Sequence, residues 1–310
     1  MKKILITGGS GFLGRNLALK LKKNYLVIIT SRNQEKLKEA AEYCKCKYMT
    51  MDINSINSIS DVFNQIKPDY VIHAGASKYV DISENNPNET IDTNVIGSQN
   101  VARISIDKGV KAVIGISTDK TAQPINNIYA LSKSIMERLF YGLSHKTNTN
   151  FVSVRFGNIA WSTGSIFPLW KNMIYKNKLI QSTSPQSTRF FISIDQAIDL
   201  IITALVNHKR LSGKILTTEM KSAKIIDILD IWCKKFKVKW KKIKHRKGDS
   251  DYENIIGINE IKSSSYINIK NKKYIVIDFS KNNLSHFKET LNSNNSKRLS
   301  QREIIKLSKF

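Results

Sequence analysis

The sequence predicts an α/β fold that consists of a doubly wound parallel sheet and a smaller C-terminal domain. Short apolar runs alternate with stretches of helical periodicity up to about residue 220, and a glycine-rich turn joins the first run to the first helix. Strands that are apolar on both faces are typical of parallel sheets with helices on each side. The texture of the chain changes after residue 220, which indicates that a smaller unit begins there.

The expected strands and helices follow one another regularly. An apolar run at 3–7 is followed by apolar residues at helical spacing over 12–23. Further strands are expected at 25–30, 69–73, 111–117, 151–156 and 213–218, and helices at 90–108, 129–142 and 195–207. The lysine-dense run 234–247, in which Phe236, Val238 and Trp240 alternate with lysines, fits an edge strand with one solvated face. Residues 281–299 are rich in Asn, Ser and Lys and are expected to form a loop or a weak helix.

The composition is that of a folded protein. With 310 residues, of which 41% are hydrophobic, the chain can bury a core and is too apolar for intrinsic disorder. No apolar run approaches the ~18 residues of a membrane span, and the run Ile4–Ile6 is too short for a signal peptide. Cys44, Cys46 and Cys233 cannot form a disulfide framework, and no second Cys/His cluster completes a metal site. We therefore expect a reduced, soluble, cytoplasmic protein without a bound metal.

The net charge of +25 suits an anionic partner, such as nucleic acid, an acidic membrane or a phosphorylated substrate. Residues 221–310 hold 22 Lys and Arg residues against 9 Asp and Glu residues. The joint abundance of Lys, Asn and Ile is also typical of an AT-rich coding sequence. The charge alone therefore does not identify a partner.

The glycine-rich turn has the spacing of a dinucleotide-binding loop. Gly8, Gly11 and Gly14 follow a predicted strand and open a predicted helix. Glycines permit the tight turn and let the backbone approach a pyrophosphate, which the free N–H groups of the helix N-terminus would bind. The turn predicts a Rossmann-type site with contacts from Gly8, Ser10, Gly11, Phe12, Leu13 and Gly14.

The end of the second predicted strand favours NADP over NAD. NAD sites usually carry an acidic residue there, whereas this chain has Ser31 and Arg32, with Lys36 one helical turn further on. A guanidinium suits bidentate contact with a 2′-phosphate. The alternative is an exposed arginine at the end of a strand. Asp52 and Ile53 follow the third strand-like stretch and are expected to flank the adenine.

A phenol and an ammonium lie four residues apart on one face of a predicted helix, at Tyr129 and Lys133. A nearby cation lowers the pKa of a phenol from its usual value of about 10. Such a phenol can take a hydroxyl proton while hydride leaves the same carbon for nicotinamide. The pair follows Ser117 and Thr118 at a strand end, which favours a catalytic site over an ordinary exposed helix face.

These motifs are part of a longer resemblance. From residue 3 to about residue 253 the chain resembles the extended short-chain dehydrogenase/reductase superfamily. Within it, the chain is similar to the soluble inverting UDP-N-acetylglucosamine 4,6-dehydratases of pseudaminic acid and polysaccharide biosynthesis. The matching stretches are His73–Val80, Glu84–Pro87, Thr93–Gly97, Ile116–Lys120, Pro124–Asn126, Tyr129 with Lys133, Arg155–Asn158, Gly164–Pro168, Thr188–Ile192 and Arg246–Glu253.

The resemblance implies NADP-dependent dehydration of UDP-N-acetylglucosamine to a UDP-4-keto-6-deoxy-hexose, with inversion at C5 left open. Oxidation at C4 acidifies the C5 proton, a base removes that proton, an acid protonates the departing C6 hydroxyl, and the hydride returns to C6. The resemblance assigns the acid to Asp119 and the base to Lys120, next to Thr118. Burial would raise the pKa of Asp119 and lower that of Lys120, whereas their mutual attraction opposes both shifts.

The resemblance also implies contacts outside these motifs. Cofactor contacts are expected at Ala74, Lys78 and Thr93, and substrate contacts at Lys78, Asn158, Arg189 and Arg246, with the two arginines at the UDP end. We accordingly assign residues 1–160 and 190–220 to an NADP-binding domain, and residues 161–189 and 221–310 to a substrate-binding region. Relatives commonly assemble, which implies a homo-oligomer.

The chain departs from the family pattern at four places. The glycine loop reads Ser-Gly-Phe-Leu-Gly at 10–14, and one extra residue lies between Lys120 and Tyr129. Trp161 and Thr163 replace small and basic residues, and Asp249-Ser250 replaces Glu-Lys. The first three departures are expected to affect the nicotinamide and sugar pockets.

Other functions fit parts of the same sequence. A nucleotide-sugar 4-epimerase or keto-reductase would share the fold and the Tyr-Lys pair. A nucleic-acid-binding protein that uses the basic C-terminal third is an alternative of another class, although the aromatic residues of 234–247 fit an edge strand better. A silent NADP-binding scaffold is disfavoured by the intact Tyr129, Lys133, Asp119 and Lys120.

Overall fold

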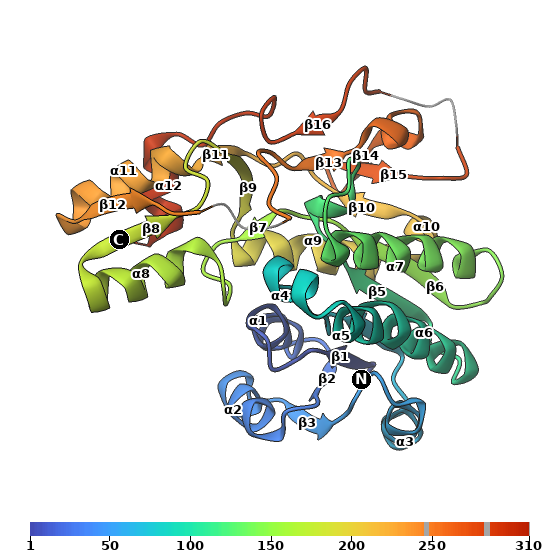
Figure 1. Cartoon of the computed structure of the whole chain (residues 1–310). Coiled ribbons are helices and arrows are strands. Elements are labelled where there is room, and N and C mark those ends of the chain that lie inside the picture. The colour runs from blue at the N-terminus through green and yellow to red at the C-terminus, as the bar shows by residue number, and fades with distance from the viewer. Residues whose placement is uncertain (245–247, 282–285, 310) are drawn as a thin grey trace.

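A nine-stranded sheet forms the centre of the molecule in the computed structural model, which describes residues 1–244, 248–281 and 286–309 (Figure 1). The strand order is β14-β15-β10-β6-β5-β4-β1-β2-β3, and all neighbours from β10 to β3 are parallel. The strands are β1 (Lys3–Thr7), β2 (Leu26–Ser31), β3 (Lys47–Thr50), β4 (Tyr70–His73), β5 (Ala112–Ile116), β6 (Asn150–Val154), β10 (Ile215–Thr217), β14 (Ser264–Ile269) and β15 (Lys272–Ile277). The predicted doubly wound Rossmann-type sheet is thus confirmed.

Helices cover both faces of this sheet because each has one apolar face. On one side lie α1 (Phe12–Leu21), α2 (Gln34–Cys44) and α9 (Ile194–Val206), which share a hydrophobic core with β1, β2 and β6. On the other side lie α3 (Ile56–Ile66), α6 (Gly97–Asp107) and α7 (Ile128–Ser144). The chain order reverses direction between β1 and β4, so the carboxyl ends of these strands open a crevice.

The helix predicted over 90–108 is not one continuous α-helix. Helix α4 (Val80–Asn85) is followed by α5 (Pro87–Ile91), by a π-helical turn η1 (Asp92–Ile96) and then by α6. The turn contains Asn94, which is fully buried and whose side chain accepts from the Ser77 backbone N–H and donates to Ser132 Oγ. Periodicity does not detect the extra residue in this turn, which orients a polar side chain inward.

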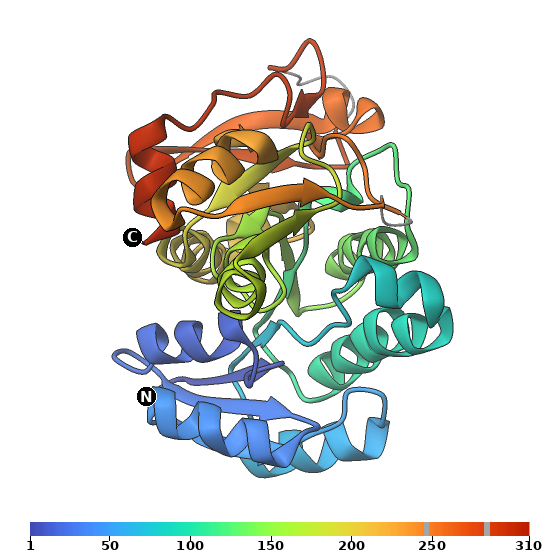
Figure 2. The same cartoon turned by 60° about the vertical axis from the view of Figure 1, so that its left-hand side comes forward.

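The remaining elements build a third core beside the sheet. Helix α8 (Ile166–Asn177), strand β8 (Leu179–Ser182), helix α11 (Ile225–Phe236), strand β12 (Lys239–Lys242) and helix α12 (Gln301–Ser308) surround Trp170 and Trp232. Trp161, with a positive φ of 65°, donates from its indole to Leu307 O and packs 6.2 Å from Trp232. Trp161 therefore anchors α12 to this core. Figure 2 shows the C-terminal elements (orange and red) at the opposite end from the N-terminal ones (blue).

Short strands and turns connect these layers. Strands β7 (Asn158–Ile159), β9 (Thr188–Ile192) and β11 (Ser222–Lys224) form one small sheet, and β13 (Asn254–Ile256) pairs with β16 (Leu291–Asn292). The other elements are η2 (Asp119–Thr121), α10 (His208–Leu211) and η3 (Ile258–Ser263). No helix of the described residues is long and apolar enough to cross a membrane.

The C-terminal predictions are confirmed only in part. The edge strand expected within 234–247 is limited to β12, which pairs in parallel with β8, while Phe236 ends α11 and residues 245–247 lie outside the described residues. The described residues of 281–299 contain no helix, only β16. The hairpin β14–β15, which the domain assignment placed in the substrate-binding region, extends the central sheet at β10.

Candidate active site

A cavity of about 720 Å³ runs along the carboxyl ends of the central strands. Eighteen of the predicted site residues line it: Gly8, Ser10, Gly11, Phe12, Leu13, Gly14, Ser31, Arg32, Asp52, Ile53, Ala74, Lys78, Thr93, Thr118, Lys120, Tyr129, Lys133 and Asn158. Lys36, Asp119 and Arg189 do not line it, and Arg246 lies outside the described residues. The structure therefore brings residues from both ends of the predicted site into one cavity.

The glycine-rich turn can only be built with glycines at its two ends. Gly8 has a φ of +66°, and a Cβ there would lie 2.7 Å from the Ala74 backbone. A Cβ on Gly14 would lie 2.6 Å from Gly8 O and 2.7 Å from Gly9 Cα. A side chain on Gly8 would clash with the backbone after β4, and a side chain on Gly14 would push α1 away from the loop after β1.

The outer end of the cavity, at the glycine loop and the end of β2, carries a pair of hydroxyl groups and an ion pair. Ser10 Oγ donates to Ser31 Oγ at 2.9 Å, which joins the glycine loop to the end of β2. Arg32 donates to Glu89 Oε1 at 3.0 Å, and both side chains are exposed. Glu89, which also lines the cavity, was not identified in the sequence. Lys36 is exposed on α2, whose N-cap Asn33 accepts from the Lys36 backbone N–H.

Tyr129 lies in the first turn of α7, at the inner end of the cavity. Helix α7 is held at its start by Asn127, which caps it, and by Glu84, which accepts from the Ile128 backbone N–H at 2.8 Å. Burial raises the pKa of Tyr129 to about 12, although the Lys120 ammonium and the Thr118 hydroxyl bonded to the phenol oppose the shift. The expectation that Lys133 lowers the pKa of the phenol is therefore wrong for the protein alone: burial raises this pKa, and the cation that opposes the shift is Lys120.

Lys133 is buried one turn further along α7. Its ammonium donates to Met136 Sδ at 3.1 Å. Burial lowers the pKa of Lys133 to about 8, against the attraction of the Glu137 carboxylate. This buried ammonium faces the cavity and has no hydrogen bond to a carboxylate of the described residues, so it remains able to bind polar groups there.

Asp119 and Lys120 form the 3-10 turn η2 after β5. Lys120 Nζ lies 3.5 Å from Asp119 Oδ1 and donates to Glu253 Oε1 at 2.8 Å. Lys120 lines the cavity, whereas Asp119 lies beneath it, 1% exposed, with Oδ2 lacking a hydrogen-bond partner among the described residues. The Thr118 hydroxyl and the Lys120 amine therefore face the cavity, whereas the Asp119 carboxyl lies behind them.

The two pKa values of this pair shift in the same direction. Burial raises the pKa of Asp119 despite the attraction of Lys120. Burial alone would lower the pKa of Lys120, but Asp119 and Glu253 together outweigh it and raise the pKa. The sequence match included Glu253 without giving it a role, and this second carboxylate adds to the effect of Asp119 in keeping Lys120 a cation.

A buried charge network supports the strand ends from below. Arg155, fully buried after β6, forms ion pairs with Glu137 of α7 at 2.8 Å and with Glu260 of η3 at 2.7 Å, and donates to Ile255 O. Glu137 also accepts from Ser117 and Thr121, which flank Thr118 and Asp119. The network therefore fixes the turn η2, the catalytic face of α7 and the C-terminal segment relative to one another.

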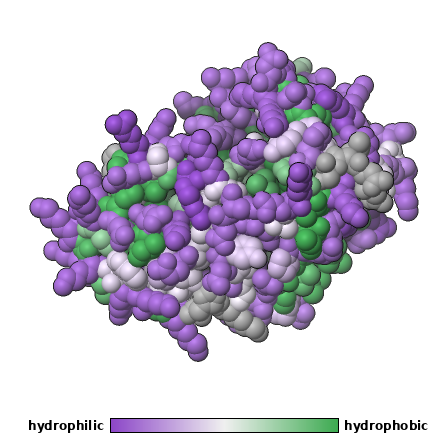
Figure 3. Space-filling model, turned by 90° about the horizontal axis from the view of Figure 1, so that it is seen from above, coloured by the Kyte–Doolittle hydropathy of each residue, from purple (hydrophilic) through white to green (hydrophobic). Residues whose placement is uncertain are grey.

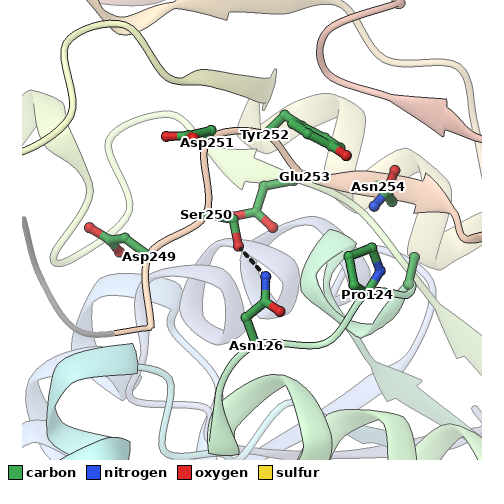
Figure 4. A pocket seen from close by; sticks show the side chains of 9 residues that line it. Pro124, Asn126, Asp249, Ser250, Asp251, Tyr252, Glu253 and Asn254 are labelled. Atoms are coloured by element: carbon green, nitrogen blue, oxygen red, sulfur yellow. Dashed lines mark hydrogen bonds between the residues drawn. The ribbon is translucent and has the colours of Figure 1, made fainter.

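A second pocket of about 300 Å³ is lined by Glu253 (Figure 4). It is formed by the loop before α7 and by residues 249–254, and Asn126 donates to Ser250 Oγ across it at 3.2 Å. Arg189 does not point into this pocket as a free cation. Its guanidinium donates to the backbone oxygens of Thr188, Ser250 and Asp251, so it holds the loop in place.

Comparison with known proteins identifies the family. The family described as "Polysaccharide biosynthesis protein" matches residues 4–278 of the chain. The chain belongs to this family.

Two curated proteins and one solved structure illustrate what the chain is similar to. The UDP-N-acetylglucosamine 4,6-dehydratase (inverting) of Campylobacter jejuni is 34% identical over 238 residues, 73% of this chain and 70% of that protein. The UDP-glucose 4-epimerase of Rickettsia bellii is 34% identical over 278 residues, 84% of this chain and 79% of that protein. The X-ray structure of Pen from Bacillus thuringiensis has a TM-score of 0.90 and 27% identity, covering 99% of this chain and 96% of that one. The resemblance to extended short-chain dehydrogenases/reductases and inverting dehydratases is thus confirmed.

Proposed function

We propose that the protein is a nucleotide-sugar 4,6-dehydratase that acts on UDP-N-acetylglucosamine and uses NADP. The observation that carries the proposal is the convergence of Thr118, Lys120 and Tyr129 on the inner end of a dinucleotide-sized cavity, with Asp119 directly behind Lys120. A phenol alone would serve oxidation and reduction, whereas water loss needs an additional acid and base. The Campylobacter jejuni relative with this activity supports the choice of substrate.

The residues of the cavity fit a dinucleotide. The positive φ of Gly8 permits the tight turn, and the missing Cβ of Gly14 lets α1 pack closely on the loop, so the helix N-terminus lies where it would bind a pyrophosphate. Ser10, Ser31 and Arg32 would hold the ribose, and the guanidinium favours the 2′-phosphate of NADP over NAD once it exchanges Glu89 for the phosphate. Asp52 and Ile53 would flank the adenine, and Ala74, Thr93 and Lys133 would contact the remainder of the dinucleotide. When bound, the cofactor would accept a hydride from C4 of the sugar and return it to C6.

The side chains of the chain would move the protons. Tyr129 takes the proton of the C4 hydroxyl of the sugar. Lys133 and Thr118 orient the phenol and this sugar hydroxyl. Asp119, whose pKa burial raises, holds the proton for the departing C6 hydroxyl. Lys120, once neutral, takes the C5 proton. Lys78 and Asn158 line the cavity near the sugar, while Arg189 and Arg246 are proposed for the UDP end.

The segments that line the cavity support the proposed division of the chain. The glycine loop and the strand ends come from residues 1–160, whereas Ser162–Ser165 enclose the cavity from the proposed substrate-binding region 161–189. Glu253 reaches Lys120 from the proposed region 221–310. We propose that the UDP-sugar binds between these parts in a homo-oligomeric enzyme.

Incubation with UDP-N-acetylglucosamine tests the proposal. The purified protein with added NADP is expected to convert the sugar to a product lighter by one water, detected by mass spectrometry, with no net consumption of NADP. The same reaction with added NAD is expected to be slower. A product of unchanged mass, or none with any UDP-, dTDP- or GDP-sugar, would contradict a dehydratase.

A 4-epimerase is the second candidate, because the Rickettsia bellii relative of that name is equally identical over a longer part of the chain. An epimerase would produce a sugar of unchanged mass and altered C4 configuration. The variants Asp119→Asn and Lys120→Ala distinguish the two functions. An epimerase would retain turnover in both variants, whereas in a dehydratase both variants would stop at or before the loss of water.

The role of Lys120 predicts a pH effect of Glu253→Gln. The neutral amine increases with pH, so the elimination rate should rise along a limb set by the pKa of Lys120, which Asp119 and Glu253 raise and Arg189 and burial lower. Removing the Glu253 charge lowers this pKa, so the limb moves to lower pH by roughly one unit. The same change lowers the pKa of Asp119, so the limb on which the acid loses its proton moves to lower pH as well. The pH profile of product formation measures this shift. Glu303→Gln, which breaks an exposed pair with Lys221, should leave the profile unchanged.

A further inference from the structure

Two helices end side by side at the edge of the molecule farthest from the β14–β15 hairpin (Figure 1). Helices α8 and α11 both end in a left-handed lysine, Lys178 with a φ of 49° and Lys237 with a φ of 52°. The strands that follow, β8 and β12, pair in parallel with Lys239 opposite Leu179. This pairing brings the two helix ends together, although they are distant in sequence.

The segments that meet here carry positive charge and no negative charge. Residues 161–187 and 234–244 together contain ten lysines and no aspartate or glutamate. We define the basic tip as Lys176, Lys178, Lys237 and Lys239 together with Tyr175 and Phe236. All four lysines are exposed, and every ion pair of the described residues lies elsewhere. Lysines complement the dipole at a helix C-terminus, but that effect does not account for the absence of acidic residues from both segments.

Two aromatic side chains are exposed among these lysines. Tyr175 is 89% exposed in the last turn of α8, and Phe236 is 40% exposed at the end of α11. Figure 3 shows hydrophobic patches among the hydrophilic side chains at the left-hand end of the molecule, where these helices lie in Figure 1. Aromatic rings and lysines that occur together on a surface suit the boundary between headgroups and acyl chains of a bilayer.

The geometry points to a lipid surface more than to nucleic acid. Proteins that bind single strands run the strand along a groove, whereas neither described cavity is lined by a residue of the basic tip. The tip is an end of the molecule, and a projecting end can meet a flat anionic surface with all four ammonium groups. We propose that the basic tip docks the protein peripherally on a bilayer that contains anionic phospholipids.

Sedimentation with vesicles tests this proposal on the full chain. The protein is expected to bind vesicles of phosphatidylcholine and phosphatidylglycerol in equal parts, not phosphatidylcholine alone, and to be released by high salt. The variant Lys176→Glu/Lys178→Glu/Lys237→Glu/Lys239→Glu should lose binding by roughly tenfold or more. Tyr175→Ala should weaken the binding that remains at intermediate salt.

A matched variant separates the basic tip from net charge. Lys23, Lys38, Lys47 and Lys272 are exposed on other parts of the molecule, and their joint replacement by Glu changes the net charge by the same amount. This variant should keep vesicle binding. Equal loss in both variants, no binding to anionic vesicles, or tip-dependent binding of an RNA oligonucleotide that exceeds vesicle binding would overturn the proposal. Circular dichroism verifies that each variant is folded.

Discussion

Tyr129→Phe is expected to lower oxidation of the sugar by about a hundredfold to ten-thousandfold, because the ring loses the oxygen that accepts the C4 hydroxyl proton. Thr118, which is bonded to the phenol, and Lys120, whose charge acts on it, would remain in place, since the change removes one atom from a partly buried ring. Product formation from UDP-N-acetylglucosamine, and transient reduction of NADP in a single turnover, measure the loss. Both signals should fall together, because oxidation precedes elimination.

Tyr141→Phe is the matched control for this prediction. Tyr141 lies on the same helix, packs against His145 and Phe279, and does not line the cavity. Its loss of a hydroxyl should leave turnover within about a factor of two of the wild type. If Tyr129→Phe retained full turnover, another group would have to take the C4 proton, and the proposed mechanism would fail.

Arg155→Met is expected to destabilise the fold by about 3–5 kcal/mol, because it leaves two buried carboxylates without their cation. Arg155 is fully buried between Glu137 and Glu260, whose side chains are 2% and 8% exposed. The free energy of unfolding from urea titration, followed by circular dichroism, measures the effect. Because Glu137 also holds Ser117 and Thr121, the folded fraction should lose turnover as well.

Lys221→Met provides the comparison for Arg155. Lys221 pairs with Glu303, but both side chains are 38% exposed, so water replaces the lost partner. The free energy of unfolding should change by less than about 1 kcal/mol. A similarly small change for Arg155→Met would mean that the buried network contributes no net stability.

The sequence was sufficient to predict the parallel sheet and most of the residues that line the large cavity. Apolar runs between helices reveal buried strands, and the spacing of Gly8, Gly11 and Gly14 reports a turn that Cβ atoms would block. The hairpin β14–β15 was not predicted, because its strands mix lysine, asparagine and serine with apolar residues. Its place beside β10 depends on tertiary pairing rather than on local pattern.

The electrostatics of the site could not be predicted from the sequence alone. Asp119 and Lys120 are adjacent in the sequence, but the shorter ion pair of Lys120 is with Glu253, 133 residues further along the chain. Burial likewise determines that the pKa of Tyr129 rises, and burial depends on the whole fold. Local spacing identifies which groups meet, whereas their protonation depends on side chains that the sequence does not place.

The contact between Lys120 and Glu253 bears on how the enzyme matures during synthesis. A nascent chain that has left the ribosome only as far as β6 contains the glycine loop, Tyr129 and Lys120, yet it lacks the carboxylate that holds the amine. Recombination that exchanged the last sixty or so residues would therefore exchange the carboxylate partner of Lys120 while leaving the glycine loop and Tyr129 in place.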